Sequence, residues 1–195
     1  MFSKMLSAAT LALVVTLSSA TAKAEPLFLL PDVNFASTGD ALFIVDNDTY
    51  SLTIQTSVGD SMVIDNGTGF SFISNGSINV SVDGGAGAIA MTIGTGDSTS
   101  FVTGTLLTDT VTGNILGGHD IFAVFTVTES NMADFAVGSL LGFDVLSYNC
   151  HDIGQGIEAC KVKGDVAPVV PEPATLSLLV IGLGGLAARA RRKLG

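Results

Sequence analysis

Two histidines occur in the chain, and each is followed directly by an aspartate, as His119-Asp120 and His151-Asp152. Imidazole nitrogens and carboxylate oxygens are ligands that Zn²⁺ and other divalent metals accept, so the two dipeptides are candidates for one metal site. Neighbouring residues on a strand point to opposite faces, so the dipeptides would have to meet in loops at the same end of the fold. Exposed loop residues explain the same pattern, and this alternative stays open.

A second set of acidic residues lies in segments whose Asn and Gly content is typical of turns. Segments 46–48 and 65–67 contain Asp46, Asp48 and Asp65, whose carboxylates are the hard oxygen donors that Ca²⁺ prefers. The spacing of an EF-hand loop is absent, and simple Asx turns use the same residues. We therefore expect no cofactor and keep calcium binding at these three residues as the minority alternative.

No arrangement of residues indicates a catalytic mechanism. A GxSxG motif is absent, and the serines have no adjacent histidine. The central segment 25–167 also has no Arg, no Trp and no paired Glu, which argues against sugar hydrolysis. We predict a protein that is not an enzyme, with a metal-dependent extracellular enzyme built on the two His-Asp dipeptides as the alternative.

The central segment is strongly acidic. It holds 17 of the 18 acidic residues, and its basic residues are Lys161 and Lys163. A surface of this charge cannot neutralise phosphates, so we expect no nucleic-acid partner, and anionic membranes are poor partners of this segment.

Residues 1–24 are typical of a secretory signal peptide. A positive Lys4 precedes an apolar run, and the small residues Ala22 and Ala24 stand at the −3 and −1 positions of a cleavage site. This segment predicts export through the Sec translocon and cleavage by signal peptidase after Ala24.

Cys150 and Cys160 are the two cysteines of the chain. An exported chain reaches a compartment where disulfides persist, and an even pair this close in sequence is most simply one disulfide. A metal-binding or thiol-redox role is the alternative, although no CxxC spacing supports it.

The C-terminal segment 168–195 has three parts in a fixed order. Pro171, Glu172 and Pro173 precede the apolar stretch 176–188, and a basic cluster follows. Residues 173–194 are long enough for one transmembrane helix, because Arg and Lys side chains can reach the interface and hold the cytoplasmic side. The basic cluster consists of Arg189, Arg191, Arg192 and Lys193.

These three parts resemble the PEP-CTERM sorting signal of Gram-negative bacteria that make exopolysaccharide and biofilm matrix. The resemblance covers the C-terminal tail alone. It implies that an exosortase, a membrane-embedded cysteine transpeptidase or protease, recognises the Pro-Glu-Pro motif and removes the tail.

The central segment has the period-two alternation of strands with one wet face. Turn residues separate the strands at roughly 8 to 12 residue spacing, which favours an antiparallel β-sandwich of jelly-roll or Ig-like size. Asn75-Gly76 predicts a type I′ hairpin, and segment 130–141 has a weak helical pattern that could equally be a strand edge. The expected strands are 41–45, 50–54, 62–64, 70–73, 78–82, 88–93, 101–107, 121–127 and 143–148.

The sequence thus divides into a signal peptide (1–24), an acidic exported β domain (25–167) and a sorting signal (168–195). We expect a precursor held in the inner membrane by its C-terminal helix and a mature protein at the cell surface or outside the cell. Its expected function is a structural or binding component of the extracellular matrix, with exopolysaccharide as the candidate ligand and a calcium-binding, adhesin-like module as a further alternative.

Overall fold

The computed structural model describes residues 27–94, 99–114 and 118–170, and this region is built from β-strands. One short 3-10 helix, η1 (Thr56–Val58), interrupts them. The strands are β1 (Leu27–Phe28), β2 (Asp32–Ala36), β3 (Leu42–Asp46), β4 (Thr49–Gln55), β5 (Ser61–Asp65), β6 (Phe70–Phe72), β7 (Gly76–Asp83), β8 (Ala86–Ile93), β9 (Ser100–Asn114), β10 (Gly118–Ser130), β11 (Leu140–Gly154) and β12 (Ile157–Val170).

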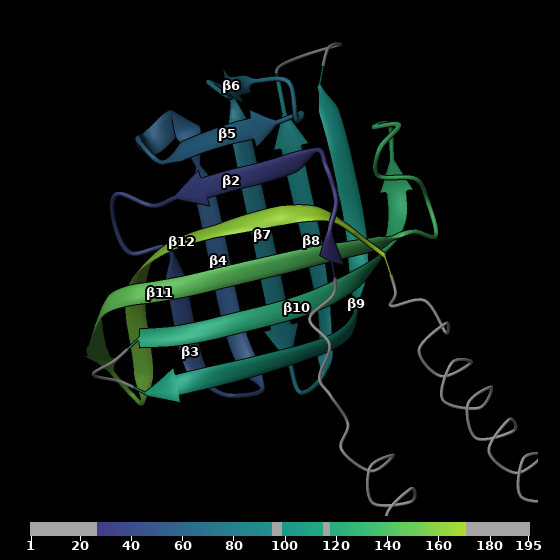
Figure 1. Cartoon of the computed structure of the whole chain (residues 1–195). Coiled ribbons are helices and arrows are strands. Elements are labelled where there is room, and N and C mark those ends of the chain that lie inside the picture. The colour runs from purple at the N-terminus through teal and green to yellow at the C-terminus, as the bar shows by residue number, and fades with distance from the viewer. Residues whose placement is uncertain (1–26, 95–98, 115–117, 171–195) are drawn as a thin grey trace, which may run out of the picture.

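Eight of these strands close into a β-barrel. Their order is β11-β10-β9-β8-β7-β4-β3-β12, and β12 pairs again with β11, so the ring has no open edge. Strands β10, β11 and β12 run across β4, β7 and β8 (Figure 1). The predicted β-sandwich is therefore wrong, although the prediction of an antiparallel all-β domain is confirmed.

The barrel closes because β12 pairs with β11 and also with β3. Residues 158–160 of β12 pair with β3, whereas residues 163–166 pair with β2, which leads through β5 to the edge strand β6. Register shifts in β10 and β11 accompany this bending, as β-bulges do in strongly curved sheets. Gly164 allows β12 to approach β11, because a Cβ there would overlap the carbonyl oxygen of Asp144.

The barrel interior is filled with apolar side chains. The Phe143 ring stacks on Phe35 at 6.0 Å between centroids and meets Phe125 edge-on at 6.4 Å. Inward residues alternate with outward ones along each strand, which is why the sequence has period two. Further fully buried residues are Leu42, Leu52, Ile54, Ile78, Ile89, Met91, Ile121 and Val162.

The nine predicted strands are all present, but the hairpin predicted at Asn75-Gly76 is wrong. Asn75-Gly76 does not close a hairpin, because β6 pairs with β5 while β7 pairs with β4 and β8. Segment 130–141, for which a helix and a strand edge were both open, contains no helix: Ser130 ends β10, Leu140 begins β11, and the turns between them bury Phe135 in the core. The β7–β8 hairpin instead turns at Gly84 and Gly85, which have the positive φ of 58° and 81° that such turns require.

The two ends of the described region lie side by side. Leu27 in β1 pairs with Val170 at the end of β12, so the strand continues past the expected domain boundary at residue 167. The predicted signal peptide and the predicted transmembrane helix at 173–194 lie outside the described residues. Within the described part of the chain, no helix has the length and apolar character needed to cross a membrane.

Candidate functional site

A buried histidine faces a carboxylate inside the wall of the barrel. The Nε2 atom of His119 on β10 lies 2.9 Å from Oε2 of Glu158 on β12, and their side chains are 7 % and 13 % exposed. Burying a polar group costs free energy unless the group forms a hydrogen bond, and here the two side chains bond each other. With a protonated imidazole the contact is an ion pair, and with a neutral one it is a hydrogen bond.

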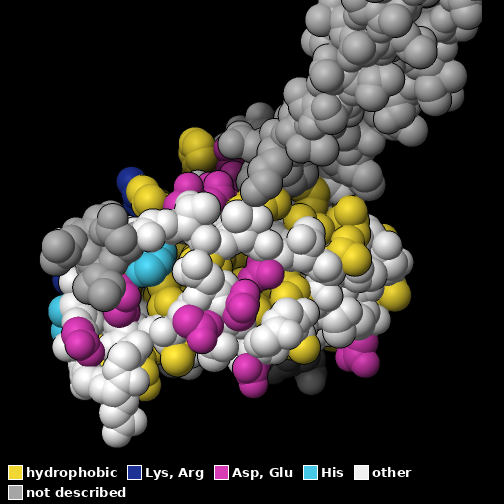
Figure 2. All heavy atoms as spheres, turned by 90° about the horizontal axis from the view of Figure 1, so that it is seen from below, with side chains coloured by type: hydrophobic (Ala, Val, Ile, Leu, Met, Phe, Trp, Pro, Cys, Tyr) yellow, Lys and Arg dark blue, Asp and Glu magenta, His cyan; other side chains and the backbone are white. Residues whose placement is uncertain are grey.

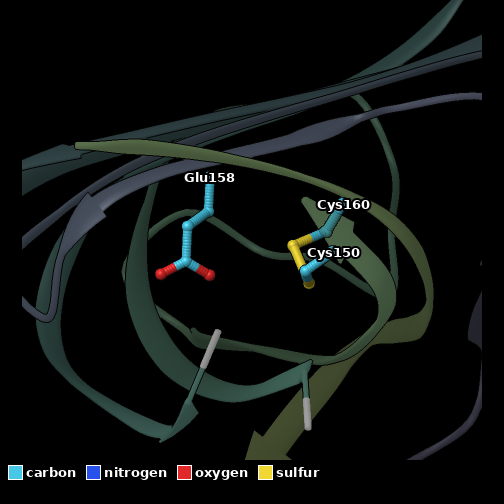
Figure 3. A group of neighbouring side chains, drawn as sticks. All are labelled: Cys150, Glu158 and Cys160. Carbon is cyan, nitrogen blue, oxygen red and sulfur yellow. A yellow bond between two sulfur atoms is a disulfide. The ribbon is translucent and has the colours of Figure 1, made fainter. Parts of the chain in front are cut away.

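The predicted disulfide lies next to this pair. Cys150 and Cys160 are joined, with their Cα atoms 4.1 Å apart, and the bond links β11 to β12. Glu158 and Cys160 are two residues apart on β12 and therefore share one face of the strand. Their ligand atoms and the Cys150 sulfur all lie within 4.8 Å of one another (Figure 3). In the disulfide form the sulfurs are bonded to each other and offer no thiolate to a metal.

Ser147 connects the histidine to the disulfide. Its buried Oγ accepts a hydrogen bond from the backbone N–H of His119 and lies 3.4 Å from the Cys150 sulfur. The serine contact is to the backbone of His119 and not to its ring, so it does not provide the serine–imidazole bond of a nucleophilic triad. The ring atom Nδ1 of His119 is buried and has no hydrogen-bond partner.

The other members of the two His-Asp dipeptides make separate contacts. Asp120 is exposed on the face of β10 opposite the buried histidine. The exposed His151 ring lies 3.5 Å from Asp40 Oδ2, and Asp152 Oδ1 accepts the N–H of Gly154. The structure thus gives the two histidines different carboxylate partners and does not bring the four predicted ligands together.

The acidic residues named as calcium candidates occupy Asx turns. Asp46 Oδ1 accepts the N–H of Asp48 at 2.9 Å, and Asp65 Oδ1 accepts the N–H of Gly67 at 2.7 Å. These contacts match the turn interpretation of the sequence.

An acidic groove on the outer face was not predicted. Asp165 on β12 lies opposite Asp144 on β11 and Asn34 on β2. Burial raises the pKa of the Asp165 carboxyl to about 6, and the charges of Asp32 and Asp144 raise it further in the same direction. Burial also raises the pKa of Asp32 against the lowering effect of its bond to Asn34. The groove, of about 280 Å³, is lined by Asn34, Phe35, Asp144, Leu146, Lys163, Gly164 and Asp165.

The sequence indicated neither the His119–Glu158 pair nor the acidic groove, because each includes residues from strands far apart in the chain. His119 and Glu158 are 39 residues apart, and nothing in one strand indicates which strand faces it. One usable signal was present, since the period of β12 places Glu158 on the same face as Cys160.

The described region is an antiparallel β-barrel with one disulfide, and its last strand runs into a recognisable tail. Residues 169–193 match the family model of the PEP-CTERM protein-sorting motif, so the chain carries this motif at its C-terminus, as predicted. The motif implies export and processing by an exosortase. No curated protein and no solved structure matches the chain.

Proposed function

We propose that the barrel is a non-catalytic structural or binding domain that its sorting motif delivers to the cell surface or the extracellular matrix. There it would associate with the exopolysaccharide of a biofilm. The sorting motif at 169–193 supports the delivery step. The motif begins in the last residues of β12, so the rest of the tail follows the barrel in the sequence. The barrel is therefore the part of the chain that remains when the tail is removed.

The observation that carries this proposal is the filled interior of the barrel. Apolar side chains pack against one another in the core, where the Phe143 ring stacks on Phe35 and meets Phe125 edge-on. A small barrel whose interior is occupied by its own side chains has no internal chamber for a substrate. A partner would therefore be bound by the outer surface.

The outer surface offers polar groups suited to sugar hydroxyls. Acidic side chains are spread over one face among apolar and neutral ones, and few basic side chains are seen there (Figure 2). The groove combines carboxylates, the Asn34 amide and the Lys163 ammonium with the apolar Phe35 and Leu146. Hydroxyl groups can both donate to carboxylates and accept from amide and ammonium groups, so a neutral polysaccharide fits this lining.

The alternative of a metal-dependent extracellular enzyme needs both His-Asp dipeptides at one metal. Their separate contacts with Glu158 and Asp40 give that alternative no support.

Co-sedimentation with the host's own purified exopolysaccharide tests the proposal. We expect the full chain to sediment with the polymer, and the double variant Asn34→Ala, Leu146→Ala to bind at least tenfold more weakly. The matched surface variant Asp120→Asn should bind like the parent chain. No co-sedimentation, or equal binding by all three proteins, would contradict the proposal.

A further inference from the structure

We propose that the reduced form of the protein holds a zinc ion between Cys150, Cys160, Glu158 and His119. Three of these side chains already place their ligand atoms within 4.8 Å of one another. The fourth, His119, places Nε2 2.9 Å from the Glu158 carboxylate. Four ligands around a tetrahedral zinc ion stand about 3.3 to 3.8 Å apart, given Zn–S and Zn–N distances of about 2.3 and 2.0 Å. His119 is outside the group of three ligand atoms that lie within 4.8 Å of one another, so its ring has to move toward the two sulfurs when zinc binds.

The ligand types suit zinc better than the hard cations. Two thiolates, one imidazole and one carboxylate form a four-ligand set of the kind that closes structural zinc sites, whereas Ca²⁺ and Mg²⁺ prefer oxygen alone. Cys160 is fully buried, the His119 and Glu158 side chains are nearly so, and Cys150 is half-buried, which limits access of water to the site.

The state of His119 sets a requirement for the zinc form. The residue is 6 % exposed, yet its Nδ1 atom has no hydrogen-bond partner. A buried polar atom without a partner is uncommon and calls for an explanation beyond packing. A histidine that binds a metal through Nε2 usually donates its Nδ1–H to a carboxylate, a carbonyl or a water molecule, so the zinc form needs such a partner for this atom.

The reduced form arises by thiol–disulfide exchange. A dithiol reductant loses two electrons and two protons and becomes a disulfide, while the Sγ–Sγ bond between Cys150 and Cys160 breaks and each sulfur gains one proton. Zinc then displaces both thiol protons and binds the two thiolates. A second disulfide compound would reverse the step: it accepts the two electrons and two protons and becomes a dithiol, while the Sγ–Sγ bond re-forms and the zinc ion leaves.

Zinc binding to the full, untagged chain in mild detergent tests this proposal. The disulfide is reduced with dithiothreitol, which is then removed without air, and zinc uptake is measured by competition with a chromophoric chelator. We expect one zinc per reduced chain and none per oxidised chain. Replacing zinc by Co²⁺ should give the absorption of a tetrahedral site with thiolate ligands.

The variants separate a built site from nonspecific binding. Glu158→Gln and His119→Gln should each weaken the affinity of the reduced chain at least tenfold, while Glu129→Gln, the same change at an exposed position of β10, should leave it unchanged. Circular dichroism follows the β-sheet throughout. A reduced chain that loses its sheet or binds no zinc, or equal affinity in all three variants, would overturn the proposal.

Discussion

Replacing Asp165 by asparagine should stabilise the barrel at neutral pH. The carboxylate lies on the outer face of β12, half-buried, directly across from Asp144 and close to Asp32. Like charges on adjacent strands repel, and burial removes the water that would screen them. The Asn side chain has the same shape and carries no charge, so it removes both the cost of burying a charge and the repulsion, without leaving a cavity.

The magnitude follows from the pKa of Asp165, which is 3.8 in the unfolded reference and about 6 in the folded protein. Because the raised pKa means that the folded state binds more protons, stability falls as pH rises from about 4 to about 6 and stays low above it. A shift of about two pH units corresponds to at most about 3 kcal/mol. Solvent screening at a half-buried site reduces this to about 1 kcal/mol.

Urea denaturation of the parent and the variant between pH 4 and pH 8 measures the effect. We expect Asp165→Asn to be about 1 kcal/mol more stable at pH 7 and equal to the parent near pH 4. Asp120→Asn, a change at an exposed strand position, is the matched control and should shift neither value. Lys163 also lines the groove, and if its attraction to Asp165 outweighed the repulsion, the variant would be less stable at pH 7. That result would refute the reasoning.

Three further predictions concern the disulfide, the pairing of β11 with β12 at Gly164, and the surface charge. The double variant Cys150→Ser, Cys160→Ser should lower the free energy of unfolding by about 3 kcal/mol, the chain-entropy value for a loop of 10 residues, as measured by urea titration. Gly164→Ala should cost about 1 to 3 kcal/mol in the same titration, because its Cβ meets the carbonyl oxygen of Asp144; unchanged stability would show that β11 and β12 can separate there. Sodium and calcium chlorides at matched ionic strength should raise the melting midpoint equally, since screening at about 0.15 M acts over about 8 Å; an additional increment with calcium would indicate specific sites.

The strands were predictable because alternation is a local property of the chain. Ile78, Val80 and Val82 of β7 point inward while their neighbours face solvent, and this pattern is the same for a sandwich and for a barrel. Closure depends on the pairing of Leu42 with Cys160, which lie far apart in the sequence and have no shared local signal. Strands β1, β2 and β12 were not among the predicted strands.

Some features of the candidate site could likewise be predicted from the sequence, and others could not. The disulfide could be predicted from the cysteine count and the exported compartment, and the turn roles of Asp46 and Asp65 from Asx chemistry. The pairing of His119 with Glu158 could not, because it depends on β10 and β12 both lying beside β11.

Fractionation of the producing cells tests the central claim most directly. The protein from the extracellular matrix is analysed by mass spectrometry and compared with a chain in which Pro171, Glu172 and Pro173 are all replaced by alanine. We predict a matrix-associated barrel without residues 176–194, and a substituted chain that stays with the cells and keeps its tail. An intact tail in the matrix, or an unchanged distribution of the substituted chain, would contradict the account.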